Sequence, residues 1–393
     1  MTDVLWVTPG YPWSGDPAGG VFYRTQAQAI ARLGRVPTVV CPTPWAPWPL
    51  PLLRPHWRTL AASPRAAEDG IVRVDRPRYL NVPGEPSWAM PDRLIARAVW
   101  RVRNRWSGAA LVHGHYAITG LAAWRVARRA RLPLVLTFHG SDINAWPDQH
   151  PERLADLRAA ARDARAVIAV SAALAERILA LTGVTAVHLP LGSDHAALRG
   201  GALSRDEARR RLGLPEHRVI ALFVGHLKLA KGVRELVDGL LEAGDPWFGV
   251  LVGSGPESGY GLSDPRAAGR LVYAGARPHD DVATYLSAAD VLVLPSHREG
   301  LPTVLVEAGS LRVPVIASRV GGVPELLGSD RGTILTEISG PAVAASLRRF
   351  AQDRPSAAQA AERLAAHVTE SHSVDGNAAR LIEIYRSAAG DSA

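Results

Sequence analysis

The sequence predicts an α/β protein with two doubly wound parallel sheets, on three observations. The chain of 393 residues is too long for one ordinary core. From residue 3 onward, short β-branched runs alternate with amphipathic stretches, as in parallel βαβ units. The alternation pauses in a polar, arginine-rich connector at 193–217 and then begins again. We therefore expect an N-terminal domain at 1–192, a second domain at 193–371, and a C-terminal helix within 372–393 that packs back on the first domain.

The elements follow from this alternation in order, with one long insertion before residue 71. In the first domain we expect strands at 4–7, 38–41, 71–74, 110–113, 134–138, 166–170 and 187–189, and helices at 20–33, 118–130, 152–164 and 172–181. In the second we expect strands at 219–224, 248–252, 271–273, 291–294 and 315–317, and helices at 233–241, 282–288, 302–311, 342–350 and 357–368. Two such Rossmann-like domains place a ligand cleft at the carboxyl ends of both sheets.

Composition excludes several classes of protein. No run of 18 apolar residues is present, so we expect no membrane span. The N-terminus lacks a charged leader, which favours a cytoplasmic protein, and Cys41 is the only cysteine, which excludes an intrachain disulfide. The net charge is +8, and residues 1–195 hold 23 Arg against 14 acids. This excess favours an anionic partner, either a membrane surface or an anionic substrate, over nucleic acid.

Lysine is confined to one segment. Lys228 and Lys231 are the only lysines, and every other cation among the 45 is arginine. A compact ammonium therefore has a use at this place that a planar guanidinium does not serve. The surrounding segment, 222–232, is typical of a strand, a loop and a helix start, where phosphate is usually bound.

Two acids stand eight residues apart near a predicted strand end. Glu299 lies on the loop after the strand at 291–294, and Glu307 lies inside the following apolar helix. Such a helix gives Glu307 little reason to be there without a partner. We expect both carboxylates to face a ligand rather than solvent.

Taken together, these motifs resemble the retaining GT-B glycosyltransferases of family 4 over nearly the whole chain. The resemblance rests on the order and spacing of Gly19-Gly20, His139-Gly-Ser-Asp-Ile143, residues 225–232, Val252-Gly-Ser-Gly-Pro-Glu257, Tyr273-Ala-Gly-Ala-Arg277 and the pair Glu299 and Glu307. It implies the GT-B architecture, a UDP- or GDP-sugar as co-substrate, and no metal or other cofactor.

The resemblance also implies roles for individual residues. Lys231 would bind the diphosphate, Glu307 the ribose, and Glu299 the hydroxyls of the donor sugar, while His139 would lie beside the donor sugar and the acceptor. The rest of the donor site would comprise Gly19, Gly20, Gly225, His226, Arg277, Leu301, Pro302, Thr303 and Val304. Breaking the bond from sugar to phosphate builds negative charge on the diphosphate, which a fixed cation and helix N-terminus stabilise.

The chain departs from the family at one position. Five residues before Lys231 the family usually has an arginine, whereas this chain has His226. One permanent charge is therefore missing from the expected site. Lys228 or Arg298 could replace it, or Lys228 could be an ordinary surface lysine.

Several candidates admit a structural explanation as well. Gly19 and Gly20 let backbone N–H groups approach a diphosphate, but a flexible turn needs them equally. His139 could be a packed histidine rather than a site residue. Asp142, with Ser141, is the candidate on the acceptor side, although a helix cap explains Asp142 as well.

A basic stripe precedes the strand at 110–113. Arginines recur every fourth residue between 90 and 106, with an aliphatic face opposite, which predicts one amphipathic helix. The stripe comprises Arg93, Arg97, Trp100, Arg101 and Arg105. It suits contact with an anionic membrane at its inner face, and it equally suits a solvated helix that covers the sheet.

These observations predict an enzyme that moves a sugar from a nucleoside diphosphate donor to an acceptor hydroxyl on a lipid-linked molecule, a glycan or a small molecule. Two alternatives remain open. One is a degenerate protein that binds the sugar nucleotide without turnover, and the other is an inverting enzyme that uses His139 or Asp142 as a general base.

Overall fold

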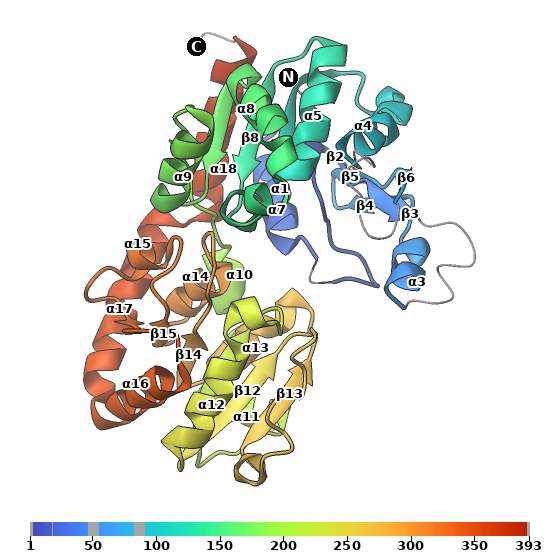
Figure 1. Cartoon of the computed structure of the whole chain (residues 1–393). Helices are drawn as coiled ribbons and strands as arrows, with labels where there is room; N and C mark the ends of the chain where they lie inside the picture. Colours follow the sequence, from blue (N-terminus) through green and yellow to red (C-terminus); the bar gives the residue numbers. More distant parts are fainter. Residues whose placement is uncertain (1–2, 18, 46–54, 82–90, 391–393) are drawn as a thin grey trace. The chain divides into compact units, whose positions relative to one another are not determined.

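The computed structural model describes residues 3–17, 19–45, 55–81 and 91–390, and its chain divides into two compact units. Unit 1 comprises residues 1–190 and 374–393, and unit 2 comprises residues 191–373. Both units are α/β with parallel sheets, so the predicted fold class is confirmed (Figure 1). No helix in the described ranges is both long and apolar enough to cross a bilayer.

The sheet of unit 1 has eight strands in the order β10-β9-β8-β7-β1-β2-β5-β4. All neighbours pair in parallel except β4, which runs antiparallel to β5 at the edge. The strands are β1 (Asp3–Val7), β2 (Thr38–Val40), β4 (Ala66–Asp69), β5 (Val72–Asp75), β7 (Ala109–His115), β8 (Leu134–Phe138), β9 (Ala166–Ala169) and β10 (Val187–His188). The insertion also supplies β3 (Thr43–Trp45), which pairs in parallel with β6 (Arg78–Leu80), and α3 (Pro55–Ala62).

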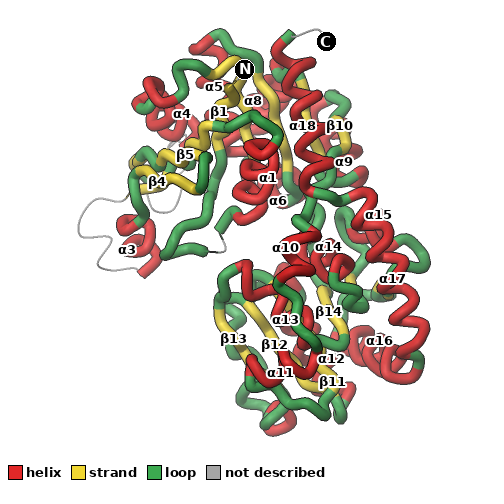
Figure 2. The backbone as a smooth tube through the Cα atoms, turned by 180° about the vertical axis from the view of Figure 1, so that it is seen from behind, coloured by secondary structure: helices red, strands yellow, loops and turns green. Residues whose placement is uncertain are grey.

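The helices of unit 1 include one from the far end of the chain. They are α1 (Val21–Arg32), α4 (Pro91–Arg101), α5 (Ala117–Ala130), α6 (Ser141–Asn144), α7 (Trp146–Gln149), α8 (Leu154–Asp163), α9 (Ala172–Thr182) and α18 (Val374–Ala389). α18 lies beside α1 and packs against β7 and β8 (Figure 2). Its Tyr385 is fully buried, and the Tyr385 hydroxyl accepts from Trp6 Nε1 at 2.9 Å and lies 2.6 Å from His113 Nδ1. The C-terminal helix thus completes the core of unit 1.

Unit 2 contains a six-stranded sheet, parallel throughout, in the order β13-β12-β11-β14-β15-β16. The chain starts at the centre of this sheet, winds outward to β13 and then returns to wind the other way, as doubly wound sheets do. The strands are β11 (Val219–Val224), β12 (Trp247–Val252), β13 (Leu271–Gly275), β14 (Val291–Leu294), β15 (Val315–Ala317) and β16 (Thr333–Ile334). The helices are α10 (His195–Gly200), α11 (Arg205–Leu212), α12 (Val233–Ala243), α13 (Val282–Ala288), α14 (Thr303–Ser310), α15 (Val323–Leu327), α16 (Gly340–Gln352) and α17 (Arg354–Ser371).

Residues 193–217 were expected to form only a polar connector between the domains. This prediction is wrong, because two helices, α10 and α11, lie within this segment. α11 packs on α13, and Arg209 of α11 is only 2% exposed. Its guanidinium donates to the Ala288 carbonyl at 3.0 Å and to the Asp290 carboxylate at 2.7 Å. Because arginine is a charged residue, the sequence alone did not show that this face of the helix is buried.

The basic helix predicted over 90–106 is wrong at its C-terminal end, after Arg101. α4 ends at Arg101, and Arg103–Arg105 form a separate 3-10 turn, so Arg105 does not continue the stripe. Trp100 does not stand free among the arginines. The centres of the Trp100 and Trp106 rings lie 5.7 Å apart. The Arg129 guanidinium lies 4.1 Å from the centre of the Trp100 ring.

Candidate active site

The loop after β11 is fixed on one side by the loop after β12. Gly253 and Gly255 have positive φ, and an added Cβ would lie 1.9 Å from the Gly225 carbonyl oxygen and 2.2 Å from that of Leu227. The backbones also exchange hydrogen bonds, from Gly225 N to Val252 O at 2.9 Å and from Leu227 N to Ser254 O at 3.0 Å. Glycine at 253 and 255 therefore serves a close approach of two backbones.

The same loop is fixed on its other side by the segment after β14. Gly232 has φ 68°, and a Cβ there would lie 1.9 Å from the Pro295 carbonyl oxygen. His297 N donates to the Ala230 carbonyl at 3.0 Å. Both contacts bring the 3-10 turn at Leu229–Lys231 beside the loop that carries Glu299.

Lys231 and Glu299 form a bidentate ion pair in this place. Lys231 Nζ lies 2.6 Å from Glu299 Oε1 and 2.7 Å from Oε2. The Glu299 side chain is 7% exposed and that of Lys231 24%, so water reaches the ammonium more easily than the carboxylate. The loop of Glu299 is held from behind, where a Cβ on Gly321 would lie 2.3 Å from the Glu299 carbonyl oxygen.

Glu307 is buried on α14 and has its own partner. Its Oε1 lies 3.0 Å from His279 Nε2, which comes from the 3-10 turn His279–Asp281 after β13. A buried carboxylate on an apolar helix needs a partner, and His279 is one. No local pattern in the sequence marks His279 as that partner.

The start of α14 offers backbone groups rather than side chains. Leu301, Pro302 and Val304 are buried, Thr303 is half-buried, and no side chain caps the helix. Its first N–H groups can therefore donate to an anion, and the dipole of the helix favours negative charge at this end. Arg277, on the segment after β13, is exposed.

The positions around the missing arginine face solvent. His226 and Lys228 are both exposed, and Gly225 is half-buried. Lys228 N donates to the His226 carbonyl at 3.0 Å, which fixes the backbone of the turn. Within the described chain, the Lys228 side chain makes no hydrogen bond or ion pair.

In unit 1, Gly20 begins α1 without a side-chain cap and with φ 77°. A Cβ at Gly20 would lie 2.7 Å from the Gly10 carbonyl, and one at Gly19 would lie 2.0 Å from Asp16 Oδ2. A close backbone contact therefore requires glycine at 20, whereas the Asp16 side chain could move to make room at 19. The open N–H groups of α1 remain free to donate.

His139 follows β8 and belongs to a stack of histidines. Its Nε2 lies 3.3 Å from His115 Nδ1, and the rings of Phe22 and Tyr23 lie 4.9 and 5.3 Å from its ring. Burial lowers the pKa of His139 to about 3, which leaves the imidazole neutral near pH 7. Among the described residues, His139 Nδ1 and His115 Nε2 are buried without a hydrogen-bond partner.

Asp142 is fully buried and shapes the turn that carries His139. Its carboxylate accepts from His139 N at 3.0 Å and from Gly140 N at 2.6 Å. Burial raises the pKa of Asp142 to about 7, although these backbone donors act in the opposite direction. Ser141 is exposed, and its Oγ lies 2.7 Å from the hydroxyl of Tyr116.

Tyr116 is a further candidate for the site, and no local pattern in the sequence marks it. It has φ 69°, which is uncommon for a bulky residue, and it stands at the carboxyl end of β7. Strained backbone of this kind clusters at functional sites. Together, Tyr116, His115 and His139 mark one polar end of the first sheet, while Lys231, Glu299, Glu307 and His279 mark another in unit 2.

Two family models and several known proteins match this chain. Residues 19–195 match the family model for glycosyltransferase family 4, and residues 204–366 match that for glycosyl transferases group 1. The chain is 37% identical over 353 residues to TuaC of Bacillus subtilis, whose name assigns it to teichuronic acid biosynthesis as a glycosyltransferase; the match covers 89% of this chain and 90% of TuaC. It is 31% identical over 324 residues to a D-inositol 3-phosphate glycosyltransferase of Streptomyces scabiei, covering 74% of this chain and 72% of that one.

Solved structures share the fold. Sucrose-phosphate synthase from Thermosynechococcus elongatus superposes with a TM-score of 0.81 at 22% identity, covering 100% of both chains. HepE from Anabaena, solved in complex with UDP, superposes with a TM-score of 0.73 at 19% identity and covers 98% of this chain and 100% of its own. At these identities the likeness concerns architecture alone.

Proposed function

This chain belongs to glycosyltransferase family 4, and from that premise we propose that it moves a sugar from a nucleoside diphosphate donor to an acceptor hydroxyl with retention of the anomeric configuration. One observation carries the proposal. Lys231 and Glu299 lie in hydrogen-bond contact at the carboxyl ends of β11 and β14, beside the uncapped start of α14. Ligands of doubly wound sheets bind at such strand ends.

In the proposed reaction the bond between the anomeric carbon and the β-phosphate oxygen breaks, and the acceptor oxygen bonds to the same face of that carbon. The acceptor proton passes to the departing phosphate oxygen. Lys231 and the α14 N-terminus would stabilise the charge that grows on the diphosphate. Glu299 would hold sugar hydroxyls, Glu307 would bind the ribose, and the backbone near Arg277 would contact the base.

His139 would act as a neutral group beside the sugar, because burial lowers its pKa. An inverting reaction would instead need a general base. Asp142 is a poor one, since it is fully buried and both of its oxygens accept backbone N–H groups. Product configuration measured by NMR tests this point: an inverted product would contradict the retaining proposal.

Incubation with UDP- and GDP-sugars, with and without a divalent ion chelator, tests donor use. We expect one nucleotide sugar to be hydrolysed slowly or transferred, at a rate that the chelator does not change. Binding of every nucleotide tried without any turnover would favour the degenerate alternative. Loss of activity with the chelator would contradict metal independence.

For the acceptor we propose a carbohydrate hydroxyl in the assembly of an anionic surface glycan, after TuaC, the relative with 37% identity. We further propose that the exposed arginines of α4 and the following turn, Arg93, Arg97, Arg101 and Arg105, meet an anionic inner membrane surface. Liposome flotation with and without anionic lipid tests the contact. Equal flotation of the protein in both cases would overturn it.

A further inference from the structure

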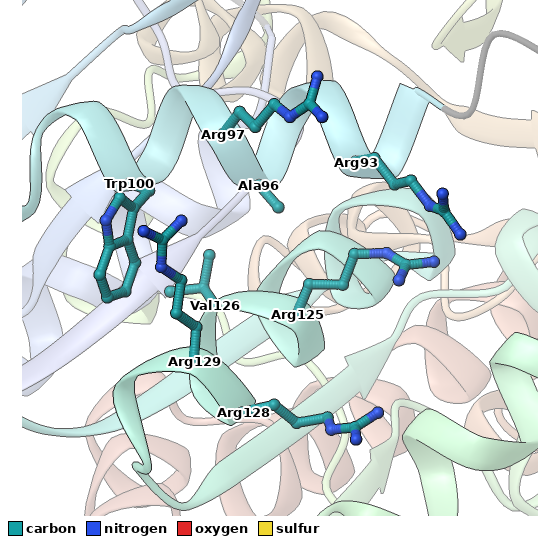
Figure 3. A pocket seen from close by; sticks show the side chains of 8 residues that line it. All are labelled: Arg93, Ala96, Arg97, Trp100, Arg125, Val126, Arg128 and Arg129. Carbon is teal, nitrogen blue, oxygen red and sulfur yellow. The ribbon is translucent and has the colours of Figure 1, made fainter.

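A pocket opens between α4 and α5 of unit 1, and part of the basic stripe lines it. Figure 3 shows side chains from both helices at this pocket. It is lined by Arg93, Ala96, Arg97 and Trp100 of α4 and by Arg125, Val126, Arg128 and Arg129 of α5. Five of these eight residues are arginines, so the pocket has an unusual concentration of positive charge.

Among the described residues, acids pair with only one of the five. Arg125 pairs with Asp92 and with Asp156, and Asp92 is buried and also bound by Arg153. In the part of the chain that the structure describes, Arg93, Arg97, Arg128 and Arg129 have no acidic partner. Like charges at this spacing repel one another, so an anion in the pocket would relieve a standing electrostatic cost.

Two of these guanidiniums are held in place by aromatic rings. Arg129 lies 4.1 Å from the centre of the Trp100 ring, and Arg128 lies 5.3 Å from that of Trp124. Stacking restricts a guanidinium to a plane while leaving its N–H groups free to donate. Arginines restricted in this way suit bidentate contacts with phosphate oxygens.

The pocket is separate from the strand ends that carry His139. α5 starts at Ala117, directly after the carboxyl end of β7, and runs back along the sheet. Arg125–Arg129 come 8 to 12 residues later, which is about 12–18 Å along the helix axis. The pocket therefore lies toward the amino ends of the strands.

We propose that the pocket between α4 and α5 is a binding site for a phosphate or diphosphate group. This inference goes beyond the transfer reaction and does not depend on it. The phosphoryl group can belong to a soluble molecule or to a lipid headgroup, since the same chemistry recognises both.

Inorganic pyrophosphate is the probe, and calorimetry at two salt concentrations measures its binding. Lys231→Ala serves as the background, so that the proposed donor site does not contribute. We expect Arg97→Ala with Arg129→Ala to weaken binding about tenfold or more, because charge-assisted hydrogen bonds are lost. Arg101→Ala is the matched control: Arg101 is exposed on the same helix, does not line the pocket, and should leave binding unchanged.

Arg129→Lys separates a formed site from general attraction. It keeps the charge and removes the planar fork, so we expect it to bind pyrophosphate more weakly than the background chain. Equal binding by the background chain, the double variant and the lysine variant would overturn the proposal. Equal loss in Arg101→Ala and in the double variant would also overturn it, because the helix would then act as a charged surface.

Vesicles distinguish the two sources of the phosphoryl group. Flotation compares phosphatidic acid with phosphatidylglycerol at matched charge. If the protein floats more strongly with phosphatidic acid, and if the double variant Arg97→Ala with Arg129→Ala loses this preference, the site binds a lipid phosphate. Pyrophosphate binding without that preference would assign it to a soluble phosphate, and flotation without any pyrophosphate binding would contradict the pocket.

Discussion

Lys231 and Glu299 lie 68 residues apart in the sequence, and the Lys231 ammonium contacts both oxygens of the Glu299 carboxylate, at 2.6 and 2.7 Å. Without a ligand, each residue satisfies the other. A diphosphate that reaches Lys231 must compete with this carboxylate, whereas a sugar hydroxyl that reaches Glu299 must compete with the ammonium. The pair thus couples binding of the diphosphate to binding of the sugar. When the diphosphate binds Lys231, Glu299 is released and can accept a hydrogen bond from the sugar.

Replacing Lys231 tests its proposed role as the cation that stabilises the leaving diphosphate. We expect Lys231→Ala to lower turnover by at least about 100-fold, because the charge on the leaving diphosphate loses its cation. The matched control is Lys228→Ala, since Lys228 is three residues away and exposed. Both variants should keep the far-ultraviolet circular dichroism of the parent. A similar loss in Lys228→Ala would show that Lys228 supplies the charge that His226 lacks.

Glu307 and His279 give opposite expectations for nucleotide affinity. Glu307→Gln should weaken UDP or GDP binding about tenfold, because a charge-assisted hydrogen bond to the ribose is lost. His279→Ala should tighten nucleotide binding, because Glu307 then no longer has to lose its 3.0 Å contact with His279 Nε2 before it binds the ribose. Calorimetry with each nucleotide measures both. Weaker binding in both variants would make His279 part of the nucleotide site instead.

Gly232 and Gly269 form a matched pair for the backbone contact with Pro295. They share a left-handed φ, of 68° and 66°, but a Cβ at Gly232 meets the Pro295 carbonyl while one at Gly269 meets nothing within 4 Å. Gly269→Ala should cost only the left-handed conformation, roughly 1–2 kcal/mol. Gly232→Ala should cost more than about 3 kcal/mol of unfolding free energy and also displace Lys231. Urea unfolding measures both, and equal costs would contradict the contact.

Stability should fall in mild acid because of the histidine stack. Burial lowers the pKa of His113, His115 and His139, so below the ordinary value of 6.5 the unfolded chain takes up protons that the folded chain does not. Each histidine then removes about 1.4 kcal/mol of unfolding free energy per pH unit. Asp142 acts in the opposite direction, since its pKa is raised to about 7 and the folded chain gains a proton as pH falls.

Urea unfolding between pH 7 and pH 5 checks the sign. We expect stability to decrease over this range, and to decrease more steeply in Asp142→Asn, where the opposing carboxyl is gone. A shallower slope in Asp142→Asn would contradict the assignment of opposite signs to the histidines and Asp142.

The sequence was sufficient for the central strands of both sheets and most of the helices between them, because period and turn residues are local signals. It did not predict α10, α11 or the short strands of the insertion. The sequence also singled out three candidate residues. Lys231 is a lysine in a chain that otherwise uses arginine, Glu299 is an acid next to a buried strand, and Glu307 is an acid inside an apolar helix. Their pairing with one another and with His279 depends on contacts between distant segments, which no local pattern encodes.

Other features were hidden for physical reasons. Gly253 and Gly255 suggest an ordinary tight turn until the backbone of Gly225 is seen beside them. The arginines of α5 look like charges that complement a helix C-terminus, and only the packing of α4 on α5 makes them one side of a pocket. The buried Arg209 likewise disguised α11 as a connector.

The place of α18 has a consequence for how the protein is made. The ribosome delivers β1 to β10 first, then all of unit 2, and only afterwards the helix that carries Tyr385. Until that helix arrives, Trp6 and His113 lack their buried hydroxyl partner, and the apolar face of α1 lacks its cover. The first half of the chain therefore lacks part of its core until a whole second domain has been synthesised.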